Sequence, residues 1–145
     1  MSRELQSVPR QLETVRVLEA CNCKTASLGL RLTEEEMTAL AEGREQALAD
    51  TGRVEFGQGI LPALAEALCD SPYLHPLDWA ETLLEAQLLF YHWKEEAGDL
   101  VPDRVLLAFL RKAFDHARGG MAYLEGFSLK ELQRNMEERA WTMED

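Results

Sequence analysis

The chain of 145 residues has no long apolar run. Its longest uninterrupted apolar stretch, Val105 to Leu110, covers six residues. A helix that crosses a membrane needs about 20 such residues. The first residues, Met1 to Gln6, also lack the apolar centre of a signal peptide. We therefore expect no membrane partner and a cytoplasmic protein.

Cysteine is scarce as well, with only Cys21, Cys23 and Cys69. An odd number at irregular spacing is typical of reduced thiols in a cytosol. Two residues apart on a helix, Cys21 and Cys23 would point to nearly opposite sides, because each residue turns the helix by about 100°. A zinc site needs four converging ligands. The sequence therefore predicts no metal site, and it shows no cofactor motif.

Basic residues are few: 15 Lys and Arg stand against 26 Asp and Glu, which gives a formal net charge of −11. Proteins that follow a nucleic-acid backbone need clustered Lys and Arg to displace counterions. We expect no nucleic-acid partner. The negative charge favours solubility and is compatible with a basic protein partner.

Helical periodicity and helix-end signals occupy most of the chain. The sequences Thr33–Glu36 and Ser128–Glu131 each have the form of a capping box, which starts a helix. These patterns predict an all-α fold, a compact bundle of about five to seven helices. The length fits one domain over residues 1–145, with an arm over about residues 1–10. The expected helices cover about residues 12–28, 33–51, 60–69, 76–97, 102–118, 121–125 and the segment after 128.

Two details of the second expected helix concern its packing. Gly43 lies inside this helix, where glycine is unfavourable unless a neighbour approaches closely. After the helix comes the short sequence TGRVEFGQG, residues 51–59. We expect this segment to be an irregular connector, because its strand-like alternation is too short to need a sheet.

Arg44 lies in the middle of the apolar face of that helix. A guanidinium there must pair with a carboxylate, extend to water or recognise a ligand, because an unpaired buried charge is very costly. Glu55, and otherwise Asp70, are the candidate partners on adjacent connectors. The three alternatives remain open at this level. Arg44, Arg53, Glu55 and Asp70 are thus candidates for a ligand site or a structural ion pair.

The last helix carries a narrow apolar stripe, which is typical of a pairing seam. The stripe could pack on the protein's own body or form the seam of a homodimer or of a complex with a protein partner. Large apolar side chains lie beside it. The candidate interface residues are Phe127, Leu132, Met136, Trp141 and Met143.

Several loop motifs are similar to those of one protein family. They are GLRLT at Gly29–Thr33, TGRVEFGQGI at Thr51–Ile60, CDSPY at Cys69–Tyr73, and AETL at Ala80–Leu83 followed by Phe90-Tyr91. From about Leu18 to Arg134 the chain resembles a family of bacterial proteins with a domain of unknown function. The resemblance implies a bacterial cytoplasmic protein. It brings no activity, cofactor or catalytic residue.

Two functions follow as expectations from these observations. The first is a small acidic protein that acts without catalysis, as a protein-binding or regulatory accessory subunit, because no catalytic constellation is found. The alternative is a small-molecule-binding protein or enzyme with a pocket near Arg44, Arg53 and Glu55. A pocket with these groups converging in it would favour the alternative.

Overall fold

The computed structural model describes the backbone of residues 3–55 and 59–144 and the side chains of residues 10–55 and 59–136. Over these residues it contains seven α-helices and no strand, which confirms the all-α prediction. There are also two short 3-10 helices: η1 (Ala26–Leu28) follows the first α-helix directly, and η2 (Pro76–Asp78) leads directly into the fourth. The α-helices are α1 (Arg3–Thr25), α2 (Glu34–Thr51), α3 (Leu61–Leu68), α4 (Trp79–Ala97), α5 (Asp103–His116), α6 (Met121–Glu125) and α7 (Leu129–Glu144).

Both predicted capping boxes are present. At the start of α2, the backbone N–H of Glu36 donates to Thr33 Oγ1 at 3.1 Å, and the N–H of Thr33 donates to Glu36 Oε1 at 2.8 Å. At the start of α7, Ser128 and Glu131 exchange the equivalent bonds at 3.1 and 3.2 Å. These bonds satisfy backbone donors that have no partner inside the helix.

The first helix differs from its prediction at both ends. It begins at Arg3, whereas the sequence predicted a start near residue 12. A formed helix extends at little cost, because each added residue contributes one more hydrogen bond. At the other end, the α-helix stops at Thr25 and a 3-10 turn leads to Gly29, whose φ is +78°.

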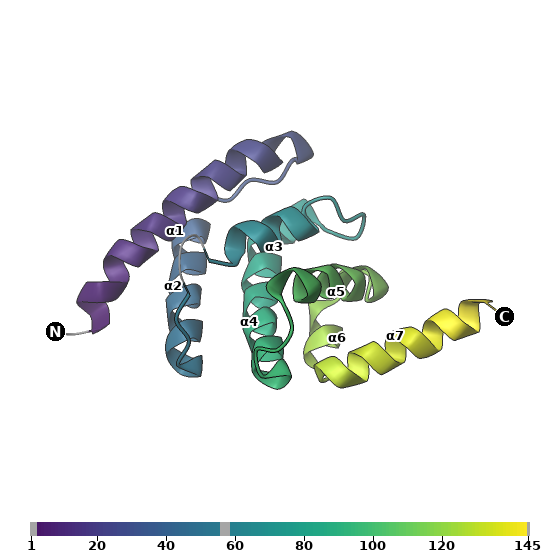
Figure 1. Ribbon diagram of the computed structural model, residues 1–145. Coiled ribbons are helices and arrows are strands. Elements are labelled where there is room, and N and C mark those ends of the chain that lie inside the picture. The colour runs from purple at the N-terminus through teal and green to yellow at the C-terminus, as the bar shows by residue number, and fades with distance from the viewer. Residues whose placement is uncertain (1–2, 56–58, 145) are drawn as a thin grey trace.

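Helix α4 lies at the centre of the fold. It contacts α2, α3, α5 and α6, while α1 packs along α2 and α3 (Figure 1). The N-terminal end of α1 and the C-terminal end of α7 project from opposite sides of the molecule (Figure 1). The largest fully buried side chains of the core are Trp79, Phe90, Trp93 and Phe114.

Helices α2 and α4 pack closely at Gly43, as the sequence predicted. A Cβ atom at this position would lie 2.6 Å from Leu84 Cδ1. The absent side chain therefore lets the two helices approach each other. This packing places the end of α2, and the connector that follows it, beside the C-terminal half of α4.

Candidate functional site

Arg44 forms the predicted internal ion pair with Glu55. Its guanidinium is only 4% exposed, and Nε donates to Glu55 Oε1 at 2.7 Å. A second nitrogen, Nη1, donates to Thr14 Oγ1 on α1 at 2.9 Å. The alternative in which Arg44 extends to water is therefore wrong. The buried charge is compensated by one carboxylate and one hydroxyl from different parts of the chain.

Tyr91 on α4 completes the arrangement around the Glu55 carboxylate. Its hydroxyl donates to the same oxygen, Oε1, at 2.7 Å. Burial raises the pKa of the Tyr91 phenol well above its ordinary value, and the neighbouring Glu55 carboxylate raises it further. The phenol therefore stays protonated and acts as a donor. Arg44 and Tyr91 together fix the position of Glu55 from two sides.

Gly59 lies directly against this ion pair. Its φ of +74° is in the left-handed region, which favours glycine. A Cβ atom there would lie 2.5 Å from Glu55 Oε1 and 2.8 Å from Arg44 Nε. A side chain at this position would displace the paired groups, so glycine is required both by the backbone and by the close contact.

Arg53 connects the same segment to the end of α4. Its Nη1 and Nη2 donate to the two carboxylate oxygens of Asp99 at 2.6 and 3.0 Å. Its Nε lies 2.7 Å from Glu95 Oε1, although the N–H is not directed along that line. The hydrogen bonds from Arg53 lower the pKa of the Asp99 carboxyl below its ordinary value. The pair is a two-bond clamp of the kind that arginine forms with carboxylates.

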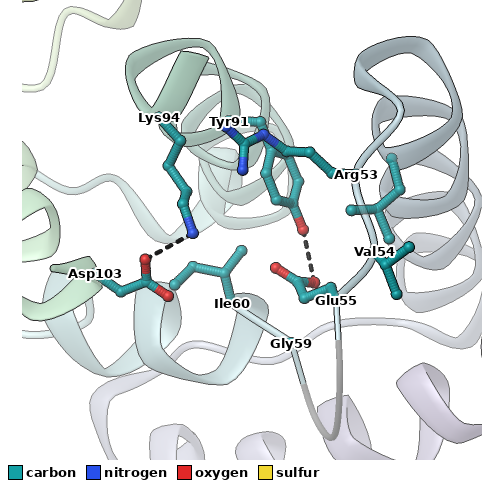
Figure 2. Close-up of a pocket in the computed structure, with 9 residues that line it drawn as sticks. Arg53, Val54, Glu55, Gly59, Ile60, Tyr91, Lys94 and Asp103 are labelled. Carbon is teal, nitrogen blue, oxygen red and sulfur yellow. Dashed lines mark hydrogen bonds and ion pairs between the residues drawn. The ribbon is translucent and has the colours of Figure 1, made fainter. Parts of the chain in front are cut away.

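A pocket of about 250 Å³ opens between the connector, α4 and the start of α5 (Figure 2). One wall carries Glu55, and the opposite wall carries Lys94, whose Nζ lies 2.9 Å from Asp103 Oδ1. The second carboxylate oxygen of Glu55, Oε2, has no hydrogen-bond partner among the described residues and points into the pocket (Figure 2). The lining residues are Leu48, Arg53, Val54, Glu55, Gly59, Ile60, Tyr91, Lys94 and Asp103.

The structure thus brings together three of the four predicted site residues. Arg53 and Glu55 line the pocket, and Arg44 lies behind Glu55. Asp70 is the exception, and its prediction as a partner of Arg44 is wrong. Its carboxylate pairs instead with Arg111 on α5, because the turn after α3 packs against that helix.

Thr14, Tyr91 and Lys94 are site residues that the sequence did not single out. In the sequence, Tyr91 stands out only within the Phe90-Tyr91 part of the shared motifs, yet a buried tyrosine hydroxyl needs a hydrogen-bond partner and could have served as a signal. Thr14 is 2% exposed, a burial that one hydroxyl on a predicted helix does not reveal. Nothing in the sequence indicated Lys94, because its ion pair with Asp103 depends on where α5 begins.

The predicted interface residues on and beside α7 have different outcomes. Leu132 is fully buried, so its prediction as an interface residue is wrong: it is part of the chain's own core. Phe127 and Met136 are partly buried against that core. The side chains of Trp141 and Met143 lie outside the described residues. An interface through these last residues stays a prediction.

The three cysteines are free thiols. Burial raises the pKa values of the Cys21 and Cys69 thiols above their ordinary value. Over the part of the chain that the structure describes, no three His, Cys, Asp or Glu side chains lie together where they could hold a metal ion. Within the same residues no helix has both the length and the apolar character to cross a membrane.

Comparison with known proteins gives one match. A protein-family model described as a family of unknown function, DUF6323, matches residues 17–142. No curated protein and no solved structure matches the chain. The match includes every residue of the pocket, from Leu48 to Asp103.

Proposed function

The chain belongs to the DUF6323 family, whose function is unknown, and we propose that it binds a small polar molecule in the pocket between the connector, α4 and α5. One observation carries the proposal. Glu55 is held rigidly through Oε1, while Oε2 points into the pocket with no partner among the described residues (Figure 2). A carboxylate oxygen in such a position is available to a donor on a ligand.

The surroundings of Glu55 support a prepared binding site. Arg44 and Tyr91 fix the carboxylate before any ligand arrives, so little conformational freedom is lost on binding. Ligand pockets commonly combine an apolar surface with a few polar groups that fix orientation. Here Val54 and Ile60 supply the apolar part, and Lys94 supplies a second charge.

This proposal takes up the second of the two functions expected from the sequence. The first, a protein-binding or regulatory accessory subunit, stays a prediction, and a small-molecule sensor could also be such a subunit. The bacterial cytoplasm is the setting that we propose. The three free cysteines fit a reducing compartment, and the acidic composition fits a dissolved protein.

A pair of matched variants tests the proposal. Val54 lines the pocket and is 71% exposed, so Val54→Trp should fill the pocket without disturbing the core. Leu77→Trp is the control, because Leu77 is 98% exposed and does not line the pocket. We would add the small-molecule fraction of bacterial cells to each protein and record native mass spectra and thermal unfolding.

We expect the wild type and Leu77→Trp to gain the same small-molecule mass and a higher unfolding temperature. Val54→Trp should gain neither. Absence of any adduct on the wild type, or an adduct that Val54→Trp retains, would contradict the proposed site.

A further inference from the structure

The charges that line the pocket balance each other. Arg53 and Lys94 are positive, and Glu55 and Asp103 are negative. Each of these groups already has a charged partner: Glu55 pairs with Arg44, Arg53 with Asp99, and Lys94 with Asp103. A ligand with a net charge would therefore bring its own uncompensated charge into a partly enclosed space. A ligand that carries one charge of each sign would keep the balance. The pocket therefore favours a zwitterion over a simple cation or a simple anion.

The positions of the charges indicate how a zwitterion would lie. Glu55 and Lys94 face each other across the pocket, and no ion pair joins these two side chains (Figure 2). Opposite charges that face each other without touching leave room for a complementary pair between them. A ligand ammonium can donate to Glu55 Oε2, and a ligand carboxylate can accept from Lys94 Nζ.

The other charged groups are less available to a ligand. Arg53 already donates two hydrogen bonds to Asp99 and lies beside Glu95. Lys94 has three donor hydrogens, and its Nζ lies 2.9 Å from Asp103 Oδ1 and 4.0 Å from Asp99 Oδ1. Only the Asp103 oxygen is within hydrogen-bond distance of Nζ, so Lys94 keeps donor hydrogens that neither carboxylate takes up. Lys94 is thus the cation that can accept a second anionic partner.

The remaining wall is apolar. Leu48 and Ile60 are buried, and Val54 is exposed at the rim. An aliphatic substituent on the ligand would cover Val54 and remove its apolar surface from water. Resting on the proposed function, we infer that the ligand is a zwitterion with a primary ammonium and a carboxylate, an amino acid with a small aliphatic side chain.

The test compares molecules that share one carbon skeleton. The twenty protein amino acids are first titrated into the ¹⁵N-labelled full chain, and shifts of backbone NMR signals are followed. The tightest binder is then compared with its decarboxylated amine and its deaminated acid. For valine these are isobutylamine and 3-methylbutanoate. We expect each single-charge analogue to bind about tenfold or more weakly, because each loses one charged hydrogen bond.

A variant of Lys94 tests whether this residue binds the carboxylate of the ligand. Lys94→Met should lower the affinity for the amino acid by about tenfold and leave the affinity for the amine unchanged. Lys112→Met is the control, because Lys112 is exposed on α5, outside the pocket, and carries the same charge. It should bind the amino acid like the wild type.

The outcomes separate the two proposals. If the amine or the acid binds as tightly as the amino acid, the zwitterion inference is overturned. If no amino acid binds but the Val54→Trp comparison still reveals a small molecule in the pocket, the inference is again overturned and the proposed function stands. If the wild type binds no small molecule at all, both fail.

Discussion

At the scale of single residues, the main feature is the charged side chain of Arg44. It lies at a position of α2 where helical periodicity predicts an apolar side chain. Arg44 is buried on α2, yet its guanidinium has Glu55 and Thr14 as partners. Removing two charges from water is costly, so such a pair adds little net stability over an apolar replacement. Removing one partner alone is different, because the other charge is then left without compensation.

The first prediction is that Arg44→Ala lowers the free energy of unfolding by about 3 kcal/mol. This is the low end of the ~3–5 kcal/mol typical of a broken buried pair, because Glu55 keeps contact with water through the pocket. Urea denaturation measures the change. Arg16→Ala, at an exposed position on α1, is the control and should change stability by about 0.5 kcal/mol or less. A loss near 1 kcal/mol for Arg44→Ala would mean that only stem packing was removed.

The second prediction uses two glycines that share a backbone conformation. Gly52 and Gly59 have φ of +67° and +74°, so alanine at either should cost about 1 kcal/mol. A Cβ at Gly52 meets nothing within 4 Å, whereas one at Gly59 meets Glu55 and Arg44. Gly59→Ala should therefore cost about 1 kcal/mol more than Gly52→Ala, as the overpacking of a tight site does. Chemical denaturation of both variants gives the comparison, and equal losses would show that the Gly59 contact is loose.

At the scale of helices, the sequence predicts best those features that depend on neighbours along the chain. The two capping boxes set the starts of α2 and α7, and both are found where predicted. Gly52 and Gly98 follow the last residues of α2 and α4 in left-handed conformations, which agrees with the predicted ends of these helices. Each signal involves residues within one or two turns, so no knowledge of the tertiary structure is needed to read it.

Features of helices that depend on distant segments were predicted less well. The sequence predicts a start of α1 near Leu12, nine residues later than observed, because no capping box precedes Leu12. For the stripe that includes Leu132 the sequence left two alternatives open, the protein's own body or an interface, and the structure buries Leu132 in the protein's own core. A narrow apolar stripe has the same spacing whether its partner is another chain or the same one.

At the scale of the whole molecule, the pocket depends on contacts between residues that are far apart in the sequence. The spacing of residues along the chain does not predict such contacts. The Arg44–Glu55 pair spans 11 residues and could be predicted, because the chain returns past the end of α2. The contacts Tyr91–Glu55 and Arg53–Asp99 span 36 and 46 residues. They exist because Gly43 lets α4 approach α2, which places the end of α4 beside the connector. Two walls of the pocket are therefore products of tertiary packing.

The Arg53–Asp99 clamp makes the attachment of these walls sensitive to acid. The folded-state pKa of Asp99 is lowered below the ordinary value of 3.8, chiefly by its hydrogen bonds with Arg53. A carboxylate with a depressed pKa contributes its full stabilisation above the unfolded-state value. That contribution is lost as the pH falls below 3.8 and through the lower folded-state pKa. The clamp should thus be intact at neutral pH and absent in strong acid.

The last prediction follows from this pH dependence. Asp99→Asn keeps a side chain that tolerates the left-handed φ of +62° but removes the charge that Arg53 binds. We expect this variant to be less stable than the wild type at pH 7, and the difference to shrink as the pH falls below 3.8. Thermal unfolding of both proteins between pH 7 and pH 3 measures it. Glu19→Gln is the control, since Glu19 is exposed on α1 and forms no ion pair among the described residues. A stability difference that stays constant across this range would show that the Asp99 carboxylate does not clamp Arg53.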